Sequence, residues 1–222
     1  MFPIRDHHPS SRFPLVTILI ITINCFIFFL EMTAPDLDQF IAQYALLPAT
    51  VNFLNPLTLV PFLTSMFLHG GWLHILSNMW FLWIFGDNIE ATLGSIGFLM
   101  FYLFAGFAAS LLQFFIDPTS VIPVLGASGA IAGVLGGYLV LFPRAQIETL
   151  VTLGYYVSRI NVSAQIMLIY WFITQLFSGV GSLAIGVAAQ GGVAFFAHIG
   201  GFAAGWLLTQ LFIKPRLKWQ IA

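Results

Sequence analysis

Long apolar stretches separated by short polar ones define the pattern of this chain. A helix needs about 20 predominantly apolar residues to cross the hydrocarbon core of a bilayer, and slightly shorter runs are tolerated. Six stretches are predicted to be transmembrane helices, and the fourth of them is short. They are residues 13–30, 72–90, 96–116, 126–142, 162–177 and 195–213.

Two of the connections between these stretches have a character of their own. Residues 32–70 contain four prolines, which divide the segment into pieces too short to span a membrane. We predict a membrane-associated first loop with short helices in the interface. Residues 178–194 are rich in glycine and alanine and carry no charge, which predicts a flexible loop that acts as a lid.

The composition is typical of a polytopic membrane protein. Hydrophobic residues make up 59% of the 222 positions and charged residues only 7%, whereas a soluble domain carries about 25% charged residues. The formal net charge of −1 offers no basic surface for nucleic acid. Cys25 is the single cysteine, so no internal disulfide can form. We predict neither a cofactor nor a bound metal.

The positive charges predict the topology. With the N-terminus inside and six spans, all lysines and arginines fall on the inner side, in agreement with the positive-inside rule. We therefore predict an all-α, six-helix membrane bundle over residues 13–213, with cytoplasmic tails at 1–12 and 214–222. The basic residues are Arg5, Arg12, Arg144, Arg159, Lys214, Arg216 and Lys218.

Four polar side chains lie at similar depth in three of the predicted helices. Counting 1.5 Å per residue from the cytoplasmic ends places Ser128 at about 22 Å, His74 and His198 at about 24 Å and Asn78 at about 18 Å. Polar groups inside a span are costly and often functional. His74 and Asn78 are four residues apart, so they share one helix face.

A serine and a histidine at one depth suggest a nucleophile and its general base. His74, Asn78 and the backbone N–H of Ser128 are suitable donors to an oxyanion. The carboxylates lie outside the spans or near their ends, so a Ser128–His198 dyad fits better than a triad. On the residues alone, a hydrolase and a transporter or ion pathway stay equally open, and Ser128 also suits helix packing.

Several motifs resemble those of the rhomboid family of intramembrane serine proteases. Residues 126–130, Gly-Ala-Ser-Gly-Ala, resemble the nucleophile motif, and residues 197–205 resemble the histidine helix with its Gly-x-x-x-Gly. Residues 69–79 resemble the second span with its His-x-x-x-Asn pair, and residues 86–90 resemble the end of that span. The similarity extends over about residues 61–205, with the motifs in the family's order.

The resemblance implies a minimal six-span protease of bacterial or archaeal type, located in a prokaryotic cytoplasmic membrane. Its substrates would be transmembrane segments of other membrane proteins, and its surroundings the lipid bilayer. Ser128 corresponds to the nucleophile and His198 to its base. His74 and Asn78 correspond to the pair that stabilises the oxyanion, and Gly126 is grouped with them as support for the active site.

Glycines in two of the helices have a packing role in this family. Gly201 and Gly205 correspond to a close contact between the last span and the glycine-bearing face of residues 126–142, which includes Gly133. His69 matches a position where a structural hydrogen bond is expected. Many members carry an aromatic residue four positions after the serine, but this chain has Ala132, so what orients the histidine is left open.

Two other functions remain as alternatives. A rhomboid-like protein without activity would bind client helices as a membrane chaperone and would need no dyad. A transporter is less favoured, because paired repeats with broken helices are not evident. For a protease, the fifth span and the loop at 178–194 are the expected gate for the substrate. The oligomeric state is left open.

Overall fold

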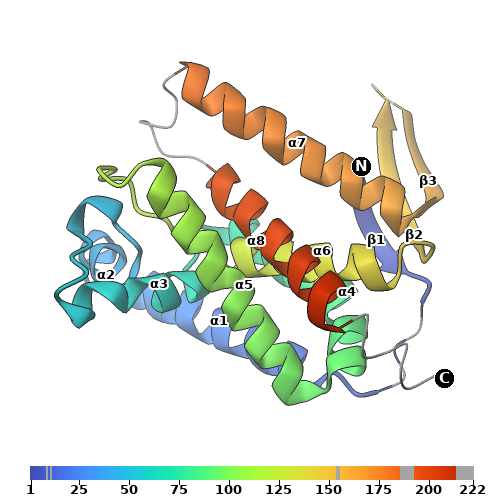
Figure 1. Cartoon of the computed structure of the whole chain (residues 1–222), viewed down its shortest axis with the longest axis horizontal. Helices are drawn as coiled ribbons and strands as arrows, with labels where there is room; N and C mark the ends of the chain where they lie inside the picture. Colours follow the sequence, from blue (N-terminus) through green and yellow to red (C-terminus); the bar gives the residue numbers. More distant parts are fainter. Residues whose placement is uncertain (9, 11, 154–155, 186–192, 214–222) are drawn as a thin grey trace.

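Eight α-helices lie in the part of the chain that this computed structural model describes, which is residues 1–8, 10, 12–153, 156–185 and 193–213. In Figure 1, α6 and α8 cross in the middle of the molecule, and α7 runs along one edge toward the sheet. The helices are α1 (Leu15–Thr33), α2 (Leu37–Tyr44), α3 (Pro61–Thr64), α4 (Trp72–Leu93), α5 (Ser95–Ile116), α6 (Ser128–Leu141), α7 (Ala164–Ile185) and α8 (Phe195–Leu208), which continues as a π-helical turn over Thr209–Ile213.

Each of the six apolar stretches contains one long helix. Four helical segments are long and apolar enough to cross a membrane by length and composition: Leu15–Thr33, Ser95–Ile116, Ala164–Gly181 and Phe195–Ile213. α4 becomes a fifth span if it is joined to Pro56–Phe67, from which it is bent by 79°. α6 has only 14 residues. The described chain is therefore mostly helical with four or five spans by this criterion, and the count of six stays a prediction.

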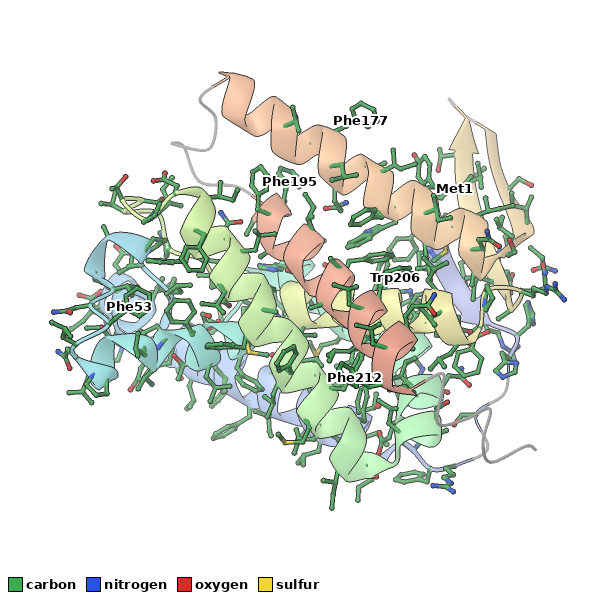
Figure 2. All side chains as sticks on the ribbon, in the orientation of Figure 1. Met1, Phe53, Phe177, Phe195, Trp206 and Phe212 are labelled. Atoms are coloured by element: carbon green, nitrogen blue, oxygen red, sulfur yellow. The ribbon has the colours of Figure 1, made fainter. Side chains whose placement is uncertain are left out.

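Large apolar side chains cover the outer surface of these helices. Phe177 points away from α7 in Figure 2, and its side chain is 76% exposed. Trp206 and Phe212 project from the outer side of the last helix and its π-helical turn. In water such a surface would be costly, whereas the bilayer accepts it.

A buried carboxylate of α4 accepts hydrogen bonds from the first turn of α1. The backbone N–H groups of Val16 and Thr17 have no acceptor within α1, since they belong to its first turn. Both donate to the Glu90 carboxylate of α4, each at 2.8 Å, and the Thr17 hydroxyl donates to it at 2.9 Å. This set of bonds fixes the start of α1 against the end of α4, next to α5.

A three-stranded antiparallel sheet corrects the all-α prediction. The strands are β1 (Phe2–Asp6), β2 (Gln146–Leu153) and β3 (Tyr156–Ser163), in the order β1-β2-β3. Phe2 pairs with Leu150, which in turn pairs with Arg159. The N-terminal tail and the loop after the fourth apolar stretch therefore form a sheet, in which Ile147 and Thr149 are fully buried. The charges of this segment led to its assignment as a loop. Its buried residues alternate with a period of two, as in a strand, and this pattern was overlooked.

The fifth and last helices also differ from the predicted boundaries. α7 extends to Ile185, so the first part of the predicted lid, residues 178–185, is helical. Residues 186–192 of that loop lie outside the described residues, as does the predicted tail at 214–222. The predicted first loop contains α2, α3 and short 3-10 turns at Pro48–Thr50, Pro56–Leu59 and Ser65–Phe67, as short helices were expected there.

Candidate active site

Ser128 and His198 come together although 70 residues separate them in the chain. Ser128 is the first residue of α6, and His198 lies in the first turn of α8. The distance from His198 Nε2 to Ser128 Oγ is 2.7 Å, which is a hydrogen bond. His198 is 8% exposed. A serine hydroxyl and an imidazole nitrogen are therefore hydrogen-bonded to each other in a largely buried site.

Close backbone packing of α6 against α8 sets this distance. A Cβ atom built on Gly201 would lie 1.9 Å from the Gly129 carbonyl oxygen, and one on Gly205 would lie 2.0 Å from that of Gly133. No side chain fits at such a distance, so glycine allows the helix backbones to touch. His198, one turn before Gly201, is thereby brought to the N-terminal end of α6.

The turn before Ser128 requires glycine for two reasons. Gly126 has φ = +121°, a conformation that residues with a Cβ atom rarely adopt. A Cβ at this position would also lie 2.6 Å from Nε2 of His74. The Gly126 N–H donates to the Ser65 carbonyl at 2.8 Å, so this amide is already occupied. Gly126 thus shapes the space between Ser128 and α4 rather than donating to a ligand there.

His74 and Asn78 of α4 face the same space. His74 Nδ1 accepts a hydrogen bond of 3.4 Å from the Gly70 N–H, which places the imidazole proton on Nε2. The Asn78 amide nitrogen is buried and has no hydrogen-bond partner among the described residues. Two N–H groups of α4 are therefore available to an acceptor beside Ser128.

A cavity of about 690 Å³ joins these groups. Its walls include His74 and Asn78 from α4, Ser128 from α6, Trp171 from α7 and His198 from α8. The amides of the first turn of α6 have no acceptors within their helix. The cavity can therefore hold a carbonyl group next to the Ser128 hydroxyl, within a wall that also contains the donors His74 and Asn78.

A glutamine that was not predicted from the sequence holds the other side of the histidine ring. Gln175 of α7 places its Oε1 2.8 Å from His198 Nδ1. Trp171, one turn earlier in α7, has its ring centroid 5.7 Å from that of His198. The available signal was an amide side chain within the apolar stretch 162–177. These two residues contact the His198 ring in a chain that has Ala132 where many family members carry an aromatic residue.

His69 takes part in the site through its backbone. Its N–H donates to both carboxylate oxygens of Glu31 at the end of α1, at 3.0 and 3.2 Å. Its ring centroid lies 5.1 Å from that of His74, with the rings nearly perpendicular. The segment before α4 is thus fastened to α1, which places the His74 ring.

Comparison with protein families shows to which family the chain belongs. The family model described as "Rhomboid domain" matches residues 56–215. The chain belongs to the rhomboid family. The matched range contains both Ser128 and His198, as well as His74, Asn78 and Gln175. Membership of this family and the apolar helices make it an integral membrane protein.

The curated relatives of this rhomboid protein include proteins of a plant and of yeast. "RHOMBOID-like protein 4" of Arabidopsis thaliana is 33% identical over 158 residues, which cover 71% of this chain and 35% of that protein. "Rhomboid-like protein 11, chloroplastic" of the same plant is 31% identical over 157 residues, covering 69% and 52%. "Rhomboid protein 1, mitochondrial" of Saccharomyces cerevisiae is 39% identical over 87 residues, covering 37% and 25%. The match thus spans a quarter to about half of the length of these relatives.

Proposed function

We propose that this rhomboid protein is an intramembrane serine endopeptidase in which Ser128 is the nucleophile and His198 its general base. The observation that carries the proposal is the 2.7 Å contact between Ser128 Oγ and His198 Nε2. The hydroxyl needs a base within hydrogen-bond reach, and this distance provides one before any substrate binds. Both groups line a cavity large enough for an extended peptide segment.

In this mechanism Ser128 Oγ attacks the scissile carbonyl carbon, and its proton passes to His198 Nε2. The negative charge that develops on the carbonyl oxygen is stabilised by the Nε2–H of His74 and the amide of Asn78. The imidazolium then gives its proton to the leaving amine as the C–N bond breaks, which leaves an acyl ester on Ser128. A water molecule attacks this ester, with His198 again taking and returning the proton.

The proposed substrates are transmembrane segments of other membrane proteins. The peptide bonds of a helix are shielded by their own hydrogen bonds, so a substrate helix must unwind locally before attack. We propose that it approaches from the bilayer past α7, because this helix contributes Trp171 to the cavity wall. Six spans with both termini on the cytoplasmic side would place the cavity in the outer half of the membrane.

The names of the relatives bear on the membrane in which this protein resides. A prokaryotic cytoplasmic membrane, the expectation from the sequence, receives none from the relatives, whose names include a chloroplastic and a mitochondrial protein. The distribution of charged residues does not distinguish a prokaryotic membrane from the membrane of an organelle. The sheet carries Arg5 and Arg159 at one end of the molecule, where two of the predicted cytoplasmic segments meet.

The test is covalent labelling and cleavage. Purified protein is incubated with a fluorophosphonate probe, and in liposomes with a single-span substrate. Ser128→Ala and His198→Ala should each abolish labelling, and cleavage should fall by at least about 1,000-fold. Ser110→Ala is the matched control, because Ser110 is a buried serine of α5. Cleavage by Ser128→Ala at the wild-type rate would contradict the proposal and favour a client-binding protein without catalytic activity.

A further inference from the structure

The hydrogen bond between Gln175 and His198 joins α7 to the base of the proposed reaction. Gln175 Oε1 can only accept, so the bond of 2.8 Å puts a proton on His198 Nδ1. In a neutral ring, Nε2 is then the lone-pair nitrogen that faces Ser128 Oγ. This is the tautomer that can remove the serine proton.

The orientation of the Gln175 amide is itself fixed. Its Nε2 donates to Thr174 Oγ1 at 3.2 Å and to the Trp171 carbonyl at 3.5 Å. The Thr174 hydroxyl donates to the same Trp171 carbonyl at 2.6 Å, so its lone pairs are free to accept. A reversed amide would turn its NH₂ group toward His198 Nδ1 and lose both donor contacts. The network therefore directs Oε1 toward the imidazole.

Gln175 belongs to the least buried of the membrane helices. In the apolar stretch of α7, 22% of the residues are buried, compared with 33% for α1 and 39% for α5 and α8. Ring contacts attach α7 to α8: Phe172 stacks on Phe202 at 4.5 Å between centroids, and Trp171 lies 6.1 Å from the same ring. A ring contact contains no hydrogen bond, so moving Phe172 and Trp171 away from Phe202 breaks none.

We propose that Gln175 is a positioning residue for His198, so that the site is complete only while α7 lies against α8. Resting on the proposed function, this inference goes beyond the Ser128–His198 pair. A substrate that displaces α7 breaks the bond to Nδ1, and proton transfer waits until α7 returns. The helix that admits the substrate thus also controls the base, and no carboxylate is required.

Substitutions of Gln175 test the positioning role. Gln175→Leu keeps the size of the side chain but removes the acceptor, and we expect kcat to fall about 100-fold with KM nearly unchanged. Gln175→Glu keeps an acceptor oxygen and should retain most of the activity. Its carboxylate favours the imidazolium, so the rising limb of the pH–rate profile should move to higher pH. Gln165→Leu, an exposed glutamine in the first turn of α7, is the matched control and should change kcat by less than about twofold.

A tether between α7 and α8 tests the coupling to helix position. A Cβ built on Gly179 lies 3.3 Å from Phe195 Cβ, close to the separation of a disulfide, about 3.5–4.5 Å. The pair Gly179→Cys and Phe195→Cys is made in a Cys25→Ser background. Oxidised, it should be labelled by the fluorophosphonate at the wild-type rate, because His198 stays oriented, but should not cleave a transmembrane substrate. Reduction should restore cleavage.

The outcomes separate this inference from the proposed function. A wild-type protein that is neither labelled nor active overturns both. If wild type is active, an unchanged kcat in Gln175→Leu overturns the positioning role alone. So does an equal loss in Gln175→Leu and Gln175→Glu, because a structural role would not distinguish them. Cleavage by the oxidised tether, or loss of its labelling, overturns the coupling to α7.

Discussion

At the scale of single residues, the site combines groups that have hydrogen-bond partners with donors that have none. His198 has a partner on each ring nitrogen, and His74 has one on Nδ1. The Asn78 amide nitrogen is buried with no partner among the described residues. A buried donor without an acceptor costs free energy of folding. Such a donor beside a nucleophile suits an oxyanion that exists only during the reaction.

Replacing Asn78 should therefore have opposite effects on activity and stability. We expect Asn78→Leu to lower kcat by about 100- to 1,000-fold, since one oxyanion donor is lost. The thermal midpoint should stay the same or rise, because the unsatisfied amide is removed. Asn161→Leu, the same change at an exposed position of β3, is the control. A lower midpoint with unchanged kcat would instead assign Asn78 to the fold.

At the scale of elements, one helix pair sets the geometry of the site. α6 and α8 touch through glycines, and their facing ends carry Ser128 and His198. The resemblance to the family implied this contact, and the four-residue spacing of glycines in residues 126–142 supported it, because small residues let membrane helices approach closely. The polar residues at one depth also predicted which three helices meet.

Glycine-to-alanine changes in α8 and α7 should distinguish the effect of the α6–α8 contact from the effect of the higher helix propensity of alanine. Gly201→Ala places a methyl group 1.9 Å from the Gly129 carbonyl oxygen, so α8 must move away from α6. We expect a loss of about 1–3 kcal/mol in stability and a fall in fluorophosphonate labelling of at least about tenfold. A Cβ on Gly181 of α7 meets nothing within 4 Å, so Gly181→Ala should leave labelling unchanged and stabilise slightly. Equal behaviour of the two variants would contradict the contact.

Other elements lay beyond what the sequence could predict, for physical reasons. The hairpin of β2 and β3 alternates Ile147, Thr149 and Val151 over too few residues to stand out beside long apolar helices. Gln175 gave no periodic signal, because its role depends on how far α7 lies from His198 in space. Depth along a helix can be counted from its end, but rotation about the helix axis cannot be fixed with the same certainty.

At the scale of the whole molecule, the N-terminal strand joins parts that carry the site. The Asp6 carboxylate accepts from the Asn88 amide of α4 and the His8 N–H, each at 2.7 Å, and from the Tyr138 hydroxyl of α6. The Trp80 indole of α4 donates to the Pro3 carbonyl at 2.8 Å. β1 also pairs with β2, which leads through β3 into α7. Three helices of the site are thus connected through one segment.

Removing the Asp6 carboxylate should weaken this connection. Asp6→Ala removes the acceptor of the Tyr138 hydroxyl and one of the two acceptors of the Asn88 amide, which keeps the His8 carbonyl at 3.1 Å, and we expect a loss of about 1–3 kcal/mol in stability. Asp38→Ala, an exposed carboxylate at the start of α2, should change stability by less than about 0.5 kcal/mol. The measurement is thermal unfolding in detergent. An equal midpoint for the two variants would show that β1 contributes nothing to the bundle.

The base of α7 makes that helix a lever. Its first amides, those of Ala164 and Gln165, donate to the carbonyls of Ala145 and Pro143 at 2.8 and 3.0 Å, which forms a pivot beside the end of α6. Gln175 lies about 16 Å from this pivot and Ile185 about 32 Å, at 1.5 Å per residue. A swing that carries the far end by about 4 Å therefore moves Gln175 by about 2 Å, which exceeds the tolerance of a hydrogen bond. For the proposed opening of α7, this geometry predicts that His198 loses its Gln175 partner after a displacement of only about 4 Å at the far end of the helix.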